Sequence, residues 1–514
     1  SERLTALTVR TGIDSSIEMT MEGADGELTR AAGLMTVDAF GFFQVSGQLA
    51  LERRDAQFIL NDGVVSQDPA KAKAPTQIEA DLLTVGGSGL DAFVGVNGNS
   101  DNRVGLALSG VDFGLALMTE QLAQGSTATP REFTTLKASA DAVSFVGLEG
   151  VEVAATGLLV EINRGIAGTA GKPDLVVDYS AAQLEVRAGS GDEVVVLDAD
   201  GALGELTRAA GNVKLGLFGF VSLQGDVAFE SSTRTVTLAG GESVQTDALL
   251  VGGTGVSAFV GVDGGTAQAM GLQLSDAQFG LALLTARADA TRSWTSFQAS
   301  AGSVSFTGIE GLKASATDIV VAINQAGKAG DRVVDYALTK STTDAADARN
   351  TTLSIATGAS TTLALTMDGA EGEIIKAAAS LDLDLFGFFS VQGRFAVESR
   401  SQQVTLSDGT VIKEADLVTI GASNVQAFAG VRAGEADEIG LSLGEVNFGL
   451  ALVSDPKDTS RNFTSLQARA GSAEIKGIDS LTLKVQQLLV NINDGIVVDA
   501  QQAFDTKTNT RMKL

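Results

Sequence analysis

Hydrophobic and polar residues alternate along several long stretches of this chain. Between residues 381 and 397, hydrophobic residues occupy every second position except Gly393 on both sides of a Phe-Gly-Phe interruption. The hydrophobic set is Leu381, Leu383, Leu385, Phe389, Val391, Phe395 and Val397; the polar set between them includes Asp382, Asp384, Ser390, Gln392 and Arg394. A period of two is the pattern of a half-buried β-strand. We therefore expect one long strand here, with Phe386 and Phe388 covering its polar face at mid-strand.

A shorter pattern follows each such stretch and predicts further strands. In the middle of the chain its copies begin at Leu249, Leu272, Phe297 and Leu312. Each copy places hydrophobic residues on both sides of small or turn-forming residues, which indicates a strand, a turn and a second strand. Helical periodicity is weak, so the expected fold class is all-β. Two arrangements fit: a β-solenoid of stacked coils, or antiparallel, sandwich-like repeats joined by hairpins.

One motif occurs three times at nearly constant spacing. Glu27, Glu205 and Glu373 each precede a Gly-Phe pair, and each is followed later by a second glutamate. These second glutamates are Glu52, Glu230 and Glu398. Such repetition is typical of tandem arrays. It predicts three homologous β-rich repeats, at 1–183, 184–352 and 353–514, that form an elongated rod. Residues 509–514 resemble residues 350–355, so we expect the third repeat to end at the start of a further repeat.

Composition and charge exclude several classes of function. The 514 residues include no cysteine and no histidine, which excludes disulfides, thiolate zinc sites and catalysis by Cys or His. The net charge of −27 repels nucleic acid and attracts cations. No hydrophobic run reaches the roughly 20 residues of a membrane-spanning helix, so no transmembrane segment is expected. No phosphate-binding loop, nucleophile elbow or dinucleotide fingerprint is present, and we expect no enzyme activity.

Acidic residues recur in pairs five residues apart and are candidate calcium ligands. The candidates are Glu22 and Glu27, then Asp198, Asp200 and Glu205, and finally Asp368 and Glu373. Hard cations prefer several oxygen ligands from such turns. The alternative is a solvated turn whose acids pair with Arg30, Arg208 and Lys376. Residues 86–91 match the opening of a calcium nonapeptide once. Calcium-binding rolls need this motif in consecutive coils, so we favour a glycine turn between strands here.

Several short phrases support a family resemblance. Phe-Gly-Leu-Ala-Leu occurs at 113–117, 279–283 and 448–452, and Ala-Phe-Val-Gly-Val at 92–96 and 258–262. In this repeat style the chain resembles the repeat region of giant secreted RTX-adhesin-like surface proteins of Gram-negative bacteria. The resemblance implies an extracellular or cell-surface adhesin, matrix component or filament, often dependent on calcium.

These observations lead to ranked expectations about function. The first is a non-catalytic structural or adhesive array of a large extracellular surface or filament protein. Its partners would be other copies, neighbouring repeats, a cell-surface receptor or matrix. The alternative is an open β-groove that binds apolar, lipid-like ligands, suggested by Phe218, Phe220, Phe386 and Phe388. A polysaccharide-acting enzyme on a β-helix is a third hypothesis.

Overall fold

The chain is all-β and divides into two compact units. The computed structural model describes residues 7–19, 21, 26–63, 73–166, 175–337, 352–478, 481–497 and 510–511, and no α-helix occurs in those ranges. The first unit comprises Ser1–Val143 and Leu159–Thr207, and the second comprises Ser144–Leu158 and Arg208–Leu514.

Long strands and three short hairpins make up both units. The N-terminal elements are β1 (Leu7–Arg10), β2 (Ser16–Met19), β3 (Leu28–Ala39), β4 (Phe43–Ile59), β5 (Gln77–Val96), β6 (Val104–Glu120), β7 (Glu132–Val146), β8 (Val151–Ile166), β9 (Leu184–Arg187), β10 (Val194–Leu197) and the 3-10 turn η2 (Gly201–Leu203). They are followed by β11 (Leu206–Leu217), β12 (Val221–Thr237), β13 (Ser243–Val262), β14 (Met270–Ala286), β15 (Ser293–Thr307), β16 (Leu312–Ala326), β17 (Leu353–Ala356) and β18 (Thr362–Leu365). The remaining elements are η3 (Gly369–Glu371), β19 (Ile374–Leu385), β20 (Phe389–Thr405), β21 (Val411–Val431), β22 (Ile439–Asp455), β23 (Asp458–Lys476), β24 (Lys484–Val497) and β25 (Thr510–Arg511).

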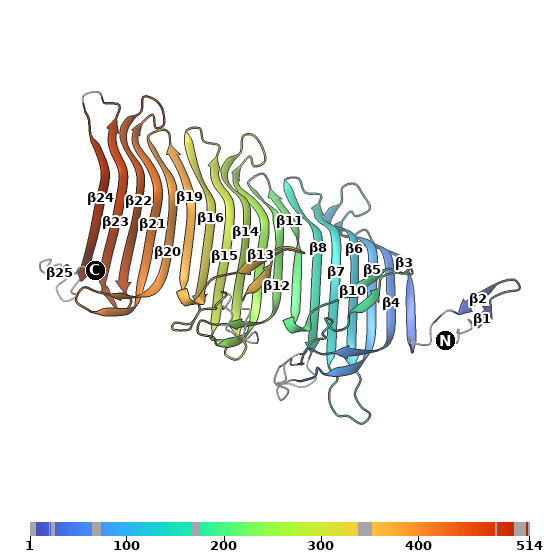
Figure 1. The fold of residues 1–514 in the computed structure, drawn as a ribbon. Helices are drawn as coiled ribbons and strands as arrows, with labels where there is room; N and C mark the ends of the chain where they lie inside the picture. The colour runs from blue at the N-terminus through green and yellow to red at the C-terminus, as the bar shows by residue number, and fades with distance from the viewer. Residues whose placement is uncertain are drawn as a thin grey trace. The chain divides into compact units, whose positions relative to one another are not determined.

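Within each unit the long strands pair antiparallel with the next long strand in sequence. In the first unit β3 pairs with β4, β4 with β5, and β5 with β6. In the second, β12 to β16 and β19 to β24 pair in order, and β16 pairs with β19 (Figure 1). The solenoid expectation is therefore wrong. Most connections between neighbouring long strands are short turns, whereas parallel strands need crossovers of about a dozen residues or more.

The alternating run at 381–397 is a hairpin and not one strand. Phe386 and Gly387 have φ values of 55° and 70°, and the Phe388 amide donates a hydrogen bond of 2.9 Å to the Leu385 carbonyl. Two positive φ values are the signature of the type I′ turn, which suits the twist of a hairpin. The expected mid-strand position of Phe386 and Phe388 is wrong, because a bulky residue at positive φ is rare and gives no turn signal.

The predicted turns inside the shorter pattern are also wrong. Each of the four copies in the middle of the chain lies within a single strand, and three of these strands, β13, β14 and β16, have an irregularity at their middle. Gly255, Asp276 and Asp318 have φ values of 59°, 53° and 52°. Glycine and aspartate tolerate this left-handed conformation as single residues. One such residue shifts the register of a strand without reversing it, so turn-forming residues here mark bulges.

Two short hairpins pack on one face of the long strands and complete the hydrophobic cores. Hairpin β9–β10 contacts β4, β5 and β6, and hairpin β17–β18 contacts β12, β13 and β14. Leu184, Val186 and Leu197 belong to the core cluster of the first unit. Leu353, Ile355 and Leu365 belong to the largest cluster of the second unit. Hairpin β9–β10 opens the expected second repeat, yet it packs on strands of the first; the boundaries of the three repeats stay a prediction.

A buried polar network anchors the segment that precedes β17. Tyr336 Oη donates to Ser296 Oγ at 2.8 Å, and Ser296 donates to Asn324 Oδ1 at 3.0 Å. Asn324 Nδ2 donates to the Val334 carbonyl at 2.7 Å. The first unit repeats the network with Tyr179, Thr135, Asn163 and the Val177 carbonyl. Asn163 and Asn324 thus each hold the backbone of a later segment, at Val177 and Val334, against the long strands.

Removing the amide of Asn324 should destabilise the protein. Asn324→Ala leaves the buried Val334 carbonyl and Ser296 hydroxyl without this partner, which we expect to lower the free energy of unfolding by roughly 2 kcal/mol. Urea unfolding followed by circular dichroism measures the change. Asn491→Ala is the control, because Asn491 lies in strand β24 and is exposed, so its removal should change stability by less than about 0.5 kcal/mol. Equal losses in both variants would contradict the anchoring role of Asn324.

Candidate functional site: the apolar face of the sheet

One face of the sheet in the second unit is hydrophobic along whole strands. In β19, Leu381, Leu383 and Leu385 alternate regularly with Asp382 and Asp384. Leu383 pairs across the hairpin with Val391, and Leu385 with Phe389. The hydrophobic set expected to share a face is therefore confirmed, although it is divided between two strands. We call this side of the sheet the apolar face and the opposite side, on which β17–β18 packs, the hairpin face.

Cross-strand rows show that the apolar face continues over many strands. Direct antiparallel partners share a face. One row joins Val221, Val260, Leu272, Phe306, Ala314, Leu383, Val391, Ala427, Leu443, Ala473 and Val485. Every residue in it is hydrophobic. The first unit has a corresponding row through Val37, Val45, Ala92 and Leu108.

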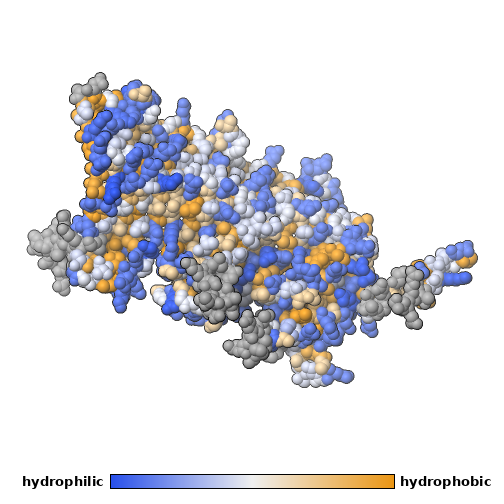
Figure 2. Space-filling model, viewed as in Figure 1, coloured by the Kyte–Doolittle hydropathy of each residue, from blue (hydrophilic) through white to orange (hydrophobic). Residues whose placement is uncertain are grey.

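The apolar face is substantially open to solvent. Val260 is 58% exposed, Leu272 is 51% exposed and Val397 is 45% exposed. Figure 2 shows the other side of the long strands, the hairpin face, where hydrophobic and polar atoms are mixed. Contiguous apolar patches above a few hundred Å² are uncommon on soluble monomers and mark sites that bind a ligand or partner. The apolar face is therefore the candidate functional surface.

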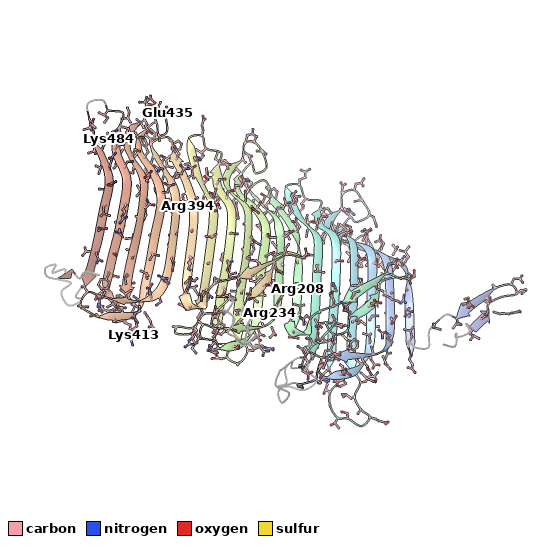
Figure 3. The ribbon with its side chains drawn as sticks, viewed as in Figure 1. Arg208, Arg234, Arg394, Lys413, Glu435 and Lys484 are labelled. Carbon is pink, nitrogen blue, oxygen red and sulfur yellow. The ribbon has the colours of Figure 1, made fainter. Side chains whose placement is uncertain are left out.

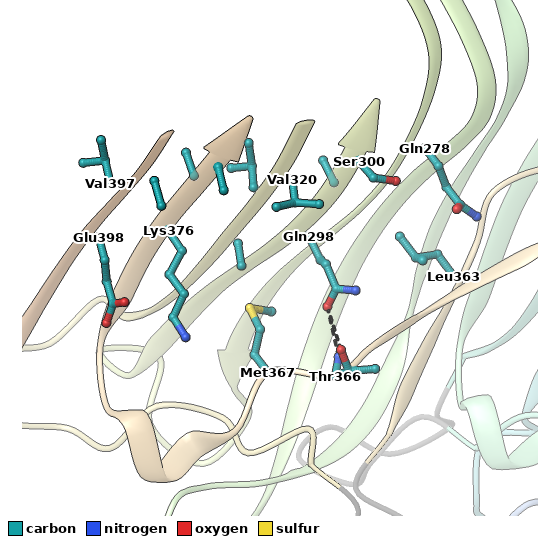
Figure 4. Close-up of a pocket in the computed structure, with 16 residues that line it drawn as sticks. Gln278, Gln298, Ser300, Val320, Leu363, Thr366, Met367, Lys376, Val397 and Glu398 are labelled. Carbon is teal, nitrogen blue, oxygen red and sulfur yellow. Dashed lines mark hydrogen bonds between the residues drawn. The ribbon is translucent and has the colours of Figure 1, made fainter. Parts of the chain in front are cut away.

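The hairpin face contains a smaller groove beside β17–β18. Its volume is about 420 Å³, and its lining combines Leu363 and Met367 with Val320 and Ala378 of the sheet. Gln298 Oε1 accepts a hydrogen bond of 3.1 Å from the Thr366 amide at its edge (Figure 4). Lys376 and Glu398 are cross-strand partners at one end of the groove. The groove is short, whereas the apolar face extends over the strands of the unit.

The phenylalanines that suggested a groove lie at hairpin turns. Phe218 and Phe386 are 64% and 56% exposed. Each amide donates to a glycine carbonyl of the preceding turn: Phe218 to Gly150 at 2.5 Å and Phe386 to Gly311 at 2.7 Å. These residues therefore join neighbouring turns and do not lie in the middle of a groove.

A buried carboxylate on the hairpin face was not predicted as a site. The Glu230 side chain is 3% exposed and forms ion pairs with Arg234 and, at 2.8 Å, with Arg208. Figure 3 labels these two arginines. Ser232 Oγ donates to the same carboxylate at 2.7 Å. Glu52 is held similarly by Arg30 at 2.8 Å and Arg54 at 3.0 Å. The sequence signal was the arginine two or four residues after this second repeated glutamate.

The arginines outweigh the effect of burial on the pKa of the Glu230 carboxylate. Burial by itself would raise the pKa of Glu230, but Arg234, Ser232 and Arg208 together hold the pKa below its usual value. Their positive charges and hydrogen bonds favour the ionised form. This arrangement is a structural clamp between β11 and β12. It is not aimed at an open cavity and gives no indication of acid–base catalysis.

The calcium candidates lie in separate local contacts. Asp198 forms an ion pair with Lys137 at 2.7 Å. Asp200 and Asp368 each accept a hydrogen bond of 2.8 Å from the alanine amide two residues later, and so begin η2 and η3. Glu373 accepts from the Ala326 amide at 3.2 Å, and Glu27 and Glu205 are exposed. Glu22 lies outside the described residues.

Among the described residues, no cluster suited to a metal joins these acids. Within the described ranges, no group of three or more aspartate and glutamate side chains is arranged to hold an ion. The glycine-rich residues 86–91 lie inside β5, so they form neither a calcium loop nor a turn. Calcium binding stays a prediction.

Comparison with known proteins gives little further information. No model of a known protein family matches the sequence, and no curated protein is significantly similar to it. Among solved structures, the chain is similar to the outer membrane transporter YddB from Escherichia coli. The match covers 91% of this chain and 68% of the transporter chain, at 11% sequence identity. The TM-score of 0.16 is too low for the likeness to support a functional argument. None of the described segments is a helix of the length and hydrophobicity needed to cross a membrane.

The Glu230 clamp should make stability depend on pH. Because the folded pKa is lowered, the clamp stabilises the protein above the unfolded glutamate pKa of about 4.3, and this stabilisation is lost as the pH falls through the folded pKa. Glu230→Gln should lower the free energy of unfolding by roughly 2 kcal/mol at pH 7 and lose less additional stability below pH 4.3. Urea unfolding at pH 3 to 7 measures both effects. The exposed Glu435→Gln is the control; a pH profile of Glu230→Gln parallel to the unsubstituted protein would rule out the clamp.

Proposed function

We propose that the protein is a non-catalytic extended β-array whose apolar face binds lipid-like molecules. The observation that carries this proposal is the uninterrupted hydrophobic row from Val221 to Val485, with residues such as Val260 and Leu272 about half exposed. A surface of this kind gains free energy when acyl chains cover it, at about 25 cal/mol per Å² of apolar area. An extracellular or cell-surface location belongs to the same proposal.

The chemistry of the surface favours chains over compact ligands. Small-molecule sites are usually concave, with a few polar groups that fix the ligand's orientation. The row from Val221 to Val485 contains no polar side chain and crosses many strands. It therefore suits flexible hydrocarbon, which needs contact area and no directional bonds. A polysaccharide would need hydrogen-bonding groups that this row lacks, so the apolar face gives no support to the third hypothesis.

The structural or adhesive array is the second candidate. It is favoured by the recurrence of the same hairpin on successive groups of strands, β9–β10 on β4–β6 and β17–β18 on β12–β14. This hypothesis predicts attachment to cells or matrix through surfaces other than the apolar face. Substitutions on the apolar face would then leave attachment unchanged, which separates it from the lipid hypothesis.

Charged substitutions on the apolar face should weaken lipid binding. The double variant Val260→Glu with Leu272→Glu places two carboxylates in one row, and both positions are exposed enough for the fold to tolerate them. We expect affinity for a fluorescent fatty acid or phospholipid to fall at least about tenfold, equivalent to about 1.4 kcal/mol. Transfer of the fluorescent lipid from vesicles, together with native mass spectrometry, measures binding.

The matched control changes the neighbouring position on the opposite face. Gln273 follows Leu272 directly in β14 and is exposed, so Gln273→Glu adds a carboxylate without touching the apolar face. It should bind lipid like the unsubstituted protein. Equal lipid binding by the double variant and the control would contradict the proposal. A failure of the unsubstituted protein to bind any lipid would also contradict it.

A further inference from the structure

The groove beside β17–β18, on the hairpin face of the second unit, has an apolar floor and polar groups at its ends. Val320 of β16 and Ala378 of β19 are direct cross-strand partners and form the floor. Leu363 and Met367 form the wall beside them (Figure 4). The volume of about 420 Å³ is in the range of small-molecule sites, which are concave and mostly apolar with a few polar groups.

The groove exists because small residues surround one exposed valine. Val320 is 50% exposed, although its strand is paired on both sides, with β15 and with β19. Ser300 and Ala378 are its direct partners on those strands, and Ala322 follows on the same face. Small side chains around a larger hydrophobic one leave apolar area in water. A molecule that covers this area gains free energy in proportion to it.

The equivalent position in the first unit holds a cluster of charges. Lys137 has the place in the first unit that Gln298 has in the second, two residues after the hydroxyl-bearing residue of the buried network. The Lys137 ammonium forms ion pairs with Asp198 at 2.7 Å and with Glu161 at 3.9 Å. Three charged side chains therefore meet at this position of the first unit.

The second unit has uncharged residues at all three positions. Gln298, Ala322 and Thr366 stand in the places of the lysine, the glutamate and the aspartate, respectively. Gln298 Oε1 accepts hydrogen bonds from the Thr366 amide at 3.1 Å and from its hydroxyl at 3.2 Å. The contact between the sheet and the segment after β18 is thus kept without charge. Because Ala322 has only a methyl group in place of a carboxylate side chain, the floor beside this contact is apolar.

One end of the groove offers hydrogen-bonding groups whose charges balance. Lys376 forms an ion pair with Glu371 of η3, and Arg400 forms one with Glu398 at 3.3 Å. Lys376 and Glu398 are also cross-strand partners. An ammonium has three N–H donors, and among the described residues only Glu371 accepts from that of Lys376. Two positive and two negative charges give an anionic head group no net attraction, and the chain carries −27 in all. An uncharged head group needs only the hydrogen bonds.

We propose that this groove binds one molecule of an uncharged amphiphile, with a medium-length acyl chain and a hydroxyl-bearing head group, as in a monoacylglycerol. The chain lies on the floor and against the wall, and the head group accepts a hydrogen bond from Lys376. Gln278 of β14 lies at the other end of the groove (Figure 4). From β19 to β14 the groove crosses three strand intervals of about 4.8 Å, roughly 14 Å in all, and an octanoyl chain is shorter than this span.

This inference goes beyond the proposed function and can fail independently of it. The groove lies on the hairpin face and holds a single molecule, whereas the proposed lipid surface lies on the opposite face and is extended. Loss of lipid transfer at the apolar face with intact binding in the groove would contradict only the proposed function. The reverse result would contradict only this inference.

Two substitutions on opposite faces test the groove against the apolar face. Val320 and Leu272 are 50% and 51% exposed, but Val320 lies in the groove and Leu272 on the apolar face. Calorimetric titration with 1-monooctanoylglycerol, below its micelle concentration, should show one saturable site per chain. Val320→Glu should weaken binding at this site at least about tenfold, because it places an unpaired carboxylate beneath the acyl chain. Leu272→Glu should leave the site unchanged. Equal binding by the two variants, or no saturable site, would overturn the proposal.

The charges of the first unit provide a second way to close the groove. The triple variant Gln298→Lys, Ala322→Glu, Thr366→Asp rebuilds the cluster that the first unit contains. Since the same three residue types are accommodated at that position, the variant should unfold in urea like the unsubstituted protein. We expect it to bind 1-monooctanoylglycerol at least about tenfold more weakly. Undiminished binding by this folded variant would contradict the assignment of the floor.

Octanoate and two variants of Lys376 test the nature of the head group. Octanoate has the same acyl chain with an anionic head, and it should bind the unsubstituted protein at least about tenfold more weakly than 1-monooctanoylglycerol. Lys376→Gln keeps a hydrogen-bond donor without the charge, and Lys376→Met keeps neither. For the uncharged ligand, Lys376→Gln should bind within about twofold of the unsubstituted protein and Lys376→Met about fivefold more weakly. Tighter binding of octanoate, or equal losses in the two variants, would overturn the proposed head group.

Discussion

The contact between a hairpin aliphatic side chain and a glycine of the long strands is the constraint on which the arrangement depends. A wide antiparallel sheet has two faces, and each must be covered or left in water. The chain covers part of one face with its own next segment, and Gly114 and Gly280 leave the space that Val186 and Ile355 occupy. Because the covering segment comes from later in the sequence, each group of strands depends on the hairpin that follows it.

Irregularities in the middle of several strands keep the apolar face continuous. In β14 the hydrophobic residues are Leu272 and Leu274 before Asp276, and Ala277, Phe279 and Leu281 after it. A strictly alternating strand would turn these two sets to opposite faces. The positive φ of Asp276 inserts one residue and returns both sets to the apolar face. The same device in β13 and β16 keeps the rows continuous, whereas β19 needs none because its alternation is regular.

The sequence predicted the all-β class and the composition of the apolar face, because alternation depends on side-chain chemistry alone. It did not predict where strands end. Phe386-Gly387 forms a turn although phenylalanine is not a turn former, and Gly255 and Asp276 lie within strands although both residue types are frequent in turns. Turn propensity measures tolerance of a backbone conformation, and that conformation serves a bulge as well as a reversal.

The Glu230 clamp could not be predicted from the sequence. The role of a repeated glutamate depends on which arginine lies beside it on the neighbouring strand, and the sequence does not show this. Arg208 is its partner from β11, 22 residues earlier in the chain. The candidate acids of the repeated pairs include residues that begin short 3-10 turns, where a single carboxylate accepts a backbone amide. Spacing alone does not distinguish these roles, because a cap and a metal ligand both require an aspartate beside a turn.

The two faces of the sheet therefore have different physical requirements. The hairpin face needs matching shapes, since a β-branched side chain must meet a glycine at van der Waals distance. The apolar face needs only area, and its exposed valines and leucines suit a ligand without fixed shape. Repetition serves both needs: each added group of strands lengthens the hydrophobic rows and offers one more place on the hairpin face where a short hairpin packs, as β9–β10 packs on β4–β6 and β17–β18 on β12–β14.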